Sequence, residues 1–253
     1  MTPRHRRLLD HIRAHGDTSV EELAKLLGVT TQTIRRDIRE LEDARLLARY
    51  HGGVGIPSTV ENIDYDRRRV MDTDAKRRIG QMAAAQVEPG RSLIINIGTT
   101  TEEVAKALQQ HKGIRVVTNN LNVASLLSGS GEVEVIVAGG LVRKRDRGIV
   151  GEATIDFMRQ FKVDIGIIGV SGIENDGTLL DYDYREVRVT QAIIEQSREV
   201  WLVADHTKFG RHALVRLGNI AQIDKFITDL PVPPEALAAF DAAGVEVLVA
   251  PAE

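Results

Sequence analysis

Two sets of residues in this 253-residue chain have types and spacings that could do chemistry. The first is the polar and basic run at 31–39, whose arginine and glutamine side chains could bond base edges and phosphates. The second is a series of polar turns, each after a β-branched stretch, whose N–H groups and hydroxyls could hold an anion. A helix must position the first set, and a parallel sheet must position the second.

The basic run fits one face of a helix that begins after Thr30, a good N-cap. At roughly 100° per residue, three apolar residues fall on one narrow stripe: Ile34, Ile38 and Leu41. Four polar or basic residues gather on the opposite side: Gln32, Arg35, Arg36 and Arg39. Asp37 and Glu40 are expected off that basic stripe, so the helix could enter a polyanionic groove. A solvated amphipathic helix is the alternative that charge alone leaves open.

Two shorter helices are predicted before it. The first closes at Gly16, and the second opens with Ser19 and Glu22, whose spacing is that of a capping box. Gly28 marks the tight turn into the third helix. Residues 46–54 are typical of a hairpin with glycine at its tip, so the three helices and hairpin together predict a winged helix-turn-helix.

Composition separates this region from the remainder of the chain. Residues 1–57 carry 10 Lys/Arg against 8 Asp/Glu, whereas residues 58–253 carry 23 against 28. Such asymmetry is a weak indication of a nucleic-acid-binding head on an acidic body. Residues 52–66 contain three glycines and a proline without sustained periodicity, as linkers do. The predicted domains are 1–57, which binds DNA, and 74–253, which is α/β, with a linker at 58–73.

Several function classes are excluded or disfavoured. The chain has no cysteine, which excludes disulfides, thiolate metal sites and cysteine nucleophiles. Its seven histidines are scattered, and no His-x-x-x-His pair flanks an acid on a predicted helix, so neither a metal nor a cofactor is expected. No stretch approaches the ~18 apolar residues of a spanning helix, and the N-terminus lacks the apolar segment of a secretory signal. We therefore expect a cytoplasmic protein.

From residue 92 onward, predicted strands alternate with helices, which favours a mostly parallel sheet that binds ligands beyond the carboxyl ends of its strands. The turn at 98–101 precedes a helix, so its N–H groups, the helix dipole and three hydroxyls could converge on an anion. A plain turn with an N-cap is the competing interpretation. The turn residues predicted to bind an effector are Gly98, Thr99, Thr100, Thr101, Asn119, Asn120, Gly139, Gly140, Ser171 and Gly172.

Two charged residues after a later strand complete the predicted effector site. Lys208 supplies a point charge suited to phosphate, and Asp205 supplies a carboxylate that can accept bonds from polyol hydroxyls. The ordinary alternatives are an exposed loop lysine and a turn-forming aspartate. The basic residues at 143–147 form either a solvated loop or a lid over an anionic ligand, and the sequence leaves both open.

Residues 4–57 resemble the winged helix-turn-helix of the deoxyribose-operon repressor (DeoR-type) family, through Gln-Thr-Ile-Arg-Arg-Asp at 32–37 and His-Gly-Gly at 51–53. The third helix reads operator DNA in that family. The resemblance therefore assigns this role to Thr31, Gln32, Thr33, Arg35, Arg36 and Arg39. Four further residues complete the predicted DNA-binding set: Ser19, Arg49, His51 and Gly52. Arg49 and His51 could contact backbone phosphate, or either could be an ordinary exposed residue.

Most of residues 74–230 resembles the effector domain of the same family, which looks like ribose-5-phosphate isomerase and related CoA transferases. The stretches at 98–100 and 205–208 carry that likeness. Those at 117–124, 148–154 and 208–211 imply, within the family, a role in glycerol 3-phosphate metabolism. The fold class expected is an α+β winged helix-turn-helix followed by an α/β domain. The resemblance does not extend to the stretch just before residue 57, to much of 58–73 or to the residues beyond 231. No functional residue is therefore assigned from it in those stretches.

The resemblance implies a repressor rather than an enzyme, because the acidic Asp-Gly-Ala-Asp-Glu loop and the Lys-Gly-Gly-Gly-Gly loop of the isomerases are absent. The comparable strand end reads Gly-Val-Ser-Gly-Ile-Glu at 169–174. We expect a homodimeric or homotetrameric repressor of a carbon-catabolism operon, which glycerol 3-phosphate or a sugar phosphate releases from double-stranded operator DNA. The alternatives are an isomerase-type enzyme with a fused DNA-binding domain, or a DeoR-type repressor that responds to a different sugar phosphate.

Overall fold

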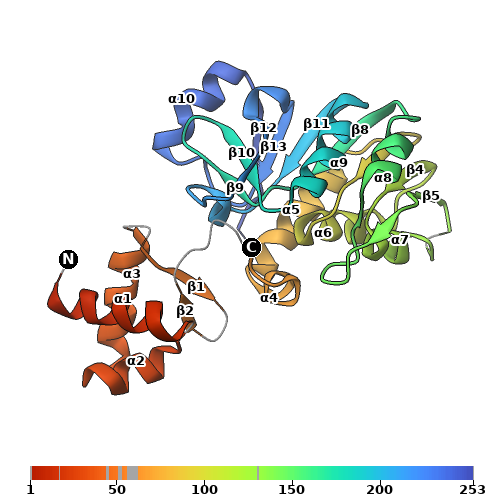
Figure 1. Cartoon of the computed structure of the whole chain (residues 1–253). Coiled ribbons are helices and arrows are strands. Elements are labelled where there is room, and N and C mark those ends of the chain that lie inside the picture. Colours follow the sequence, from red (N-terminus) through yellow and green to blue (C-terminus); the bar gives the residue numbers. More distant parts are fainter. Residues whose placement is uncertain are drawn as a thin grey trace. The chain divides into compact units, whose positions relative to one another are not determined.

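The computed structural model describes residues 2–16, 18–43, 46–50, 53–55, 62–129 and 131–252. The chain divides into two compact units, Met1–Thr59 and Val60–Glu253 (Figure 1). We call them the N-terminal unit and the C-terminal unit.

The N-terminal unit contains three helices and a short hairpin, as the sequence predicts. Its elements are α1 (Pro3–His15), α2 (Val20–Leu27), α3 (Thr31–Asp43), β1 (Ala48–Tyr50) and β2 (Gly53–Gly55). The capping box is confirmed, because Ser19 caps α2 and Glu22 bonds back to the Ser19 N–H group. Gly28 follows α2 in the left-handed conformation at φ 65°, which turns the chain toward α3.

One apolar core joins the helices to the hairpin. Its largest buried residues are Leu8, Leu9, Ile12, Leu23, Ile34, Ile38, Leu41, Leu47 and Val54. The hairpin is fastened to the start of α2 by two backbone hydrogen bonds between Thr18 and Val54, at 3.0 and 2.9 Å. A Cβ at Gly53 would lie 2.4 Å from the Thr18 carbonyl oxygen, so this contact requires glycine. The predicted winged helix-turn-helix is therefore confirmed.

The C-terminal unit is built on a seven-stranded parallel sheet with the order β14-β13-β11-β8-β3-β4-β5 (Figure 1). The strands are β3 (Ser92–Ile95), β4 (Ile114–Thr118), β5 (Val133–Val137), β8 (Val163–Ile168), β11 (Ser197–Val203), β13 (Lys225–Thr228) and β14 (Glu246–Val249). The chain runs outward from β3 to β5 and then returns to β8 beside β3. This reversal is a topological switch point, where doubly wound sheets hold their ligands.

Alternate residues along the central strands enter two separate cores. On β3, Leu93 and Ile95 pack with helices α5 (Thr73–Ala85), α6 (Thr99–Leu108) and α7 (Leu121–Leu127). Ile94 points to the other face and packs with α8 (Glu152–Met158), α9 (Tyr184–Glu195) and α10 (Pro234–Ala243). Helices therefore cover both faces, as the predicted α/β class requires.

The C-terminal unit also contains smaller elements. They are α4 (Tyr65–Val70), β6 (Leu141–Val142), β7 (Ile149–Val150), β9 (Gly172–Ile173), β10 (Thr178–Asp181), β12 (Val215–Asn219), and the 3₁₀ turns η1 (His206–Lys208) and η2 (Ile220–Gln222). Strands β9, β10 and β12 form a separate antiparallel sheet, and β6 pairs with β7.

The structure differs from the predicted linker at 58–73. Residues 65–70 form helix α4, and Thr73 begins α5 after Asp72 in the left-handed conformation at φ 47°. Helix α4 has no buried residue, so it leaves no hydrophobic periodicity in the sequence. Polar contacts to the C-terminal unit hold it instead, and residues 62–72 are part of that unit.

Gly80 lies where α5 and α6 approach most closely, and a Cβ there would be 2.6 Å from the Glu103 carbonyl carbon. We predict that Gly80→Ala lowers the free energy of unfolding by about 1–3 kcal/mol, because the two helix backbones must separate. Gly129→Ala is the control, since its Cβ would meet nothing within 4 Å. Urea denaturation measures both variants, and equal stability of the two would contradict the helix contact.

Candidate functional site

Helix α3 presents a basic and polar face to solvent. The side chains of Gln32, Arg35, Arg36 and Arg39 are exposed, as is Thr31, while Thr33 is half-buried. The opposite stripe of Ile34, Ile38 and Leu41 is at most 2% exposed. The predicted two-sided arrangement of the helix is confirmed, and its outer face is free to contact a polyanion.

Asp37 does not face the basic stripe, because it is buried beneath the helix at 2% exposure. Its carboxylate accepts hydrogen bonds from the Arg4 guanidinium, including one of 2.8 Å from Nη2. It also lies 3.3 Å from Nε2 of His5. The hydrogen bonds from Arg4 hold the pKa of the Asp37 carboxyl below its ordinary value. The acid within α3 is thus paired with a cation of α1.

One expectation about the charges around α3 requires correction: Glu40 is not away from the basic stripe, because its carboxylate lies 3.2 Å from Nε of Arg36, one helical turn earlier. The spacing of four residues brings the two side chains to the same side of the helix. Arg49 remains a predicted DNA contact, and its Nε lies 2.8 Å from the carboxylate of Glu42. Both guanidiniums are exposed, as is Glu40, whereas Glu42 is half-buried. Phosphate can therefore compete for both guanidiniums.

The other predicted DNA-binding residues are Ser19, His51 and Gly52. Ser19 caps α2, and its hydroxyl lies 2.9 Å from the Glu22 carboxylate. His51 and Gly52 lie outside the described residues.

The C-terminal unit contains a pocket rich in cations beside the carboxyl ends of its strands. Its lining residues are Ile63, Arg68, Met71, Asp72, Lys76, Asp205, Thr207, Lys208 and Arg211. Four of these are cationic and two are carboxylates, so the lining has an excess of two positive charges. Of the predicted effector residues, the pocket brings together Asp205 and Lys208.

The two lysines of the pocket are in different environments. Lys76 is 3% exposed, and its ammonium donates to the carbonyl oxygens of Arg68 and Met71, at the end of α4. Lys208 is half-buried, and among the described residues no carboxylate lies within the 4.0 Å ion-pair distance of its ammonium. Burial lowers the pKa of Lys208 to about 8, against the opposing effect of Asp205. Lys208 therefore remains available to an anionic ligand.

Asp205 has one oxygen engaged and one unpaired. Its Oδ1 accepts a hydrogen bond of 3.1 Å from the Thr207 N–H group, so Asp205 caps the turn η1. Its Oδ2 is buried without a hydrogen-bond partner in the described structure. Burial opposes ionisation, but the charges of Lys208 and Lys76 and the hydrogen bonds from Thr207 together outweigh it and keep the pKa of Asp205 below its ordinary value. An unpaired buried carboxylate oxygen in a pocket is a position for a ligand hydroxyl.

The turn at 98–101 differs from the expected set of three converging hydroxyls. Thr101 donates to the carbonyl oxygens of Asn96 and Gly98, at 2.8 Å each, so its hydroxyl is used within the turn. Thr99 and Thr100 are buried at 7% and 5% exposure, and Gly98 precedes α6 as its N-cap. None of the four residues is among those lining the pocket.

The remaining predicted turns also lie outside the pocket lining. Asn120 caps α7 through its Oδ1 and donates to Glu102 at 3.1 Å, whereas Asn119 has a buried Oδ1 without a partner among the described residues. Ser171 donates to Asp181 at 3.1 Å. Three glycines complete the set: Gly139 is exposed, a Cβ at Gly140 would clash with the Thr154 hydroxyl, and one at Gly172 would clash with the Arg211 carbonyl oxygen.

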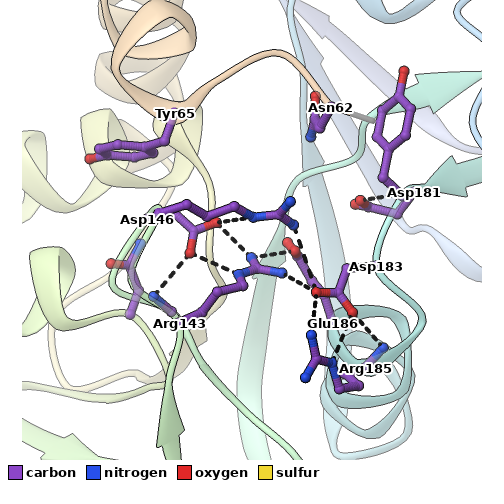
Figure 2. A network of polar contacts seen from close by, with 12 residues as sticks. Asn62, Tyr65, Arg143, Asp146, Asp181, Asp183, Arg185 and Glu186 are labelled. Atoms are coloured by element: carbon purple, nitrogen blue, oxygen red, sulfur yellow. Dashed lines mark hydrogen bonds and ion pairs between the residues drawn. The ribbon is translucent and has the colours of Figure 1, made fainter. Parts of the chain in front are cut away.

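Arg143 is the centre of a buried charge network rather than part of a basic lid. Figure 2 shows its guanidinium between Asp146 on one side and Asp183 and Glu186 on the other. It donates to these carboxylates at 2.6–2.9 Å. Burial raises the pKa of Glu186 to about 7, with a further contribution from Asp181. The carboxylates occupy Arg143, so this residue is not free to cover an anionic ligand. Three other basic residues of this loop are exposed: Lys144, Arg145 and Arg147.

Three cations of the pocket were missed from the sequence: Arg68, Lys76 and Arg211. Arg68 lies in the segment interpreted as a linker. The sequence does contain an indication for Lys76, because this residue shares the buried face of α5 with Ile79 and Ala83 at helical spacing. A lysine on an otherwise apolar helix face indicates a buried charge with a specific partner. Nothing in the spacing of Arg211 distinguishes it from an exposed loop residue.

The described part of the chain contains neither a membrane-spanning helix nor a metal-binding cluster. No helix there combines the length and apolar character that crossing a membrane requires. In the same part of the chain, no group of three or more His, Asp or Glu side chains is placed to hold a metal ion.

Comparison with known proteins identifies the two units. Residues 4–60 match the model of the DeoR-like helix-turn-helix domain, and residues 71–230 match that of the DeoR C terminal sensor domain. The chain is 48% identical over 232 residues to the glycerol-3-phosphate regulon repressor of Escherichia coli strain K12, with 92% of each chain covered. It is also 48% identical to the protein of the same name from Haemophilus influenzae, covering 90% of this chain and 89% of that one.

A solved ribose 5-phosphate isomerase A from Methanocaldococcus jannaschii matches 55% of this chain and 56% of that one, at 12% identity and a TM-score of 0.42. These two curated relatives are named repressors. Their names confirm the interpretation of this chain as a regulator, in preference to the alternative of an isomerase-type enzyme. The chain belongs to the DeoR family of transcriptional regulators.

Proposed function

We propose that this protein is a transcriptional repressor of genes for glycerol 3-phosphate metabolism, which a phosphorylated small molecule releases from operator DNA. The observation that carries the proposal is the pocket of the C-terminal unit, with its excess of two positive charges and its unpaired Asp205 oxygen. The names of the relatives support the choice of glycerol 3-phosphate as effector.

The charge of the pocket favours a phosphate monoester. Such a group carries about −1.5 to −2 charges at neutral pH, which offsets the excess of the lining. Lys208 and Arg211 supply donors to its oxygens. Asp205 Oδ2 accepts a hydrogen bond from a hydroxyl on the same ligand. Together, these groups select a small molecule with both a phosphate and hydroxyls.

The exposed face of α3 is proposed to enter the major groove. Arginine can bond guanine O6 and N7, and glutamine can bond adenine N6 and N7, so Gln32, Arg35, Arg36 and Arg39 are the proposed base readers. Helix-turn-helix repressors commonly read palindromic half-sites as symmetric dimers. We therefore propose a cytoplasmic homodimer or homotetramer.

The first test concerns the recognition helix. Arg36→Ala should weaken specific operator binding by about 1–3 kcal/mol, because it removes a bidentate base contact. Gel-shift titration with DNA from upstream of the chain's own gene and its neighbours measures the change. Arg115→Ala, at an exposed position on β4, is the control and should bind as the wild type does. Unchanged affinity of the Arg36 variant removes this residue from the readers.

The second test concerns the effector. Glycerol 3-phosphate should release the protein from operator DNA, whereas glycerol at equal concentration should not, because glycerol lacks the charge that the pocket offsets. The same gel-shift with each compound gives the result. Release by both compounds, or by neither, would contradict the proposed effector.

The third test uses the pKa of Lys208. Its ammonium is protonated below about pH 8 and neutral above that value, whereas a phosphate monoester is already a dianion. Affinity for glycerol 3-phosphate should therefore fall as the pH rises through 8, and binding near pH 8 should take up protons. Calorimetry in buffers of different ionisation enthalpy measures this uptake. Lys208→Arg, which stays charged, should abolish it; proton uptake that persists in the variant assigns it to another group.

A further inference from the structure

The wall of the effector pocket includes the chain that arrives from the N-terminal unit. Four lining residues belong to the segment at 62–72: Ile63, Arg68, Met71 and Asp72. The N-terminal unit ends at Thr59, and Asn62 lies three residues later. The pocket is therefore completed by the part of the chain through which the two units are joined.

This segment is held at three points. At its end, the Lys76 ammonium bonds two carbonyl oxygens of α4. In its middle, the Tyr65 hydroxyl donates to the Glu102 carboxylate at 2.7 Å. At its start, the Asn62 amide donates to the Ser171 hydroxyl at 3.1 Å and accepts from Arg211 Nη2 at 2.9 Å. Figure 2 shows Asn62 and Tyr65 on opposite sides of the network that the segment spans.

The three points differ in how well a ligand in the pocket can reach the group that holds them. Tyr65 and Glu102 do not line the pocket. Lys76 lines it but is only 3% exposed, and its ammonium is bonded to two carbonyl oxygens. Asn62 accepts its charge-assisted bond from Arg211, which is a half-buried lining residue. The start of the segment is therefore the point at which a ligand can compete for the holding group.

We propose that Asn62, Ser171 and Arg211 form a latch that a bound phosphate opens. A phosphate dianion is a stronger acceptor for a guanidinium than a neutral amide oxygen, and it takes the planar donor pair in a bidentate manner. Arg211 turns to the ligand, Asn62 loses its bond, and the chain leading to the N-terminal unit gains freedom. The latch rests on the proposed function, since it names how effector binding changes operator affinity.

Thermodynamic linkage between the operator and the effector predicts how removal of the latch changes the two affinities. If the closed latch favours operator binding and the open latch favours the effector, removing it must weaken the first and strengthen the second. It must also reduce the ratio of operator affinities measured without and with effector. A residue that only stabilises the fold would not raise effector affinity.

Asn62→Ala tests this in the full-length protein. We expect glycerol 3-phosphate to bind about 10- to 100-fold tighter, the size of one hydrogen bond that involves a charged group, and operator affinity without effector to fall toward the effector-bound level. Calorimetry and gel-shift titration measure the two changes, with inorganic phosphate as a second ligand. Asn175→Ala, in an exposed turn of the same unit, is the matched control and should behave as the wild type does.

Effector affinity that is unchanged or weaker in Asn62→Ala overturns the latch. If the wild type itself is not released by glycerol 3-phosphate, the proposed function fails and the latch fails with it, so the two failures are distinguishable. Amide hydrogen exchange on the wild type decides the case if the variant does not fold. Bound effector should speed exchange at residues 62–66, and unchanged or slower exchange there overturns the latch.

Discussion

The excess of positive charge in one small pocket is the main constraint that the fold of the C-terminal unit must accommodate. Four cations and two carboxylates line it, and like charges repel strongly where burial excludes water. The fold relieves this repulsion in part: Lys76 is bonded to carbonyl groups, and burial lowers the pKa of Lys208. The repulsion that remains between the lining cations favours the binding of an anion in the pocket. The binding free energy of the anionic effector that we propose is then available to change the arrangement of the chain around it.

The parallel sheet explains why the cations can be gathered in this place. All seven strands point their carboxyl ends the same way, and the switch point lies between β3 and β8. The turn after β11 contributes Asp205 and Lys208 at this edge of the sheet. The segment at 62–72 then closes the pocket from outside the sheet. One wall of the proposed effector pocket is therefore formed by the chain that leads to the N-terminal unit.

The two units use positive charge in different ways. On α3 the exposed Arg36 pairs with Glu40, and on β1 the exposed Arg49 pairs with Glu42, and phosphate can replace such surface pairs at little cost. Asp37, which could not be replaced in this way, is buried and paired with Arg4 from the opposite side of the helix. In the C-terminal unit, Arg143 is surrounded by carboxylates and held away from ligands. Burial and pairing with carboxylates, rather than charge alone, distinguish the cations that a ligand can reach from those that are engaged within the fold.

The sequence by itself determined the winged helix-turn-helix, the basic face of α3 and the α/β class of the second unit, and it predicted Asp205 and Lys208, which line the pocket. These features follow from local spacing: helical periodicity, a capping box and glycines at turns are set by neighbours within a few residues. Only the tertiary structure decided that Arg68, Lys76 and Arg211 meet at one pocket, because they come from segments far apart in the chain. It also showed that the guanidinium of Arg143 is already engaged, since its partners Asp183 and Glu186 lie 40 and 43 residues further along the chain and leave no mark on local spacing.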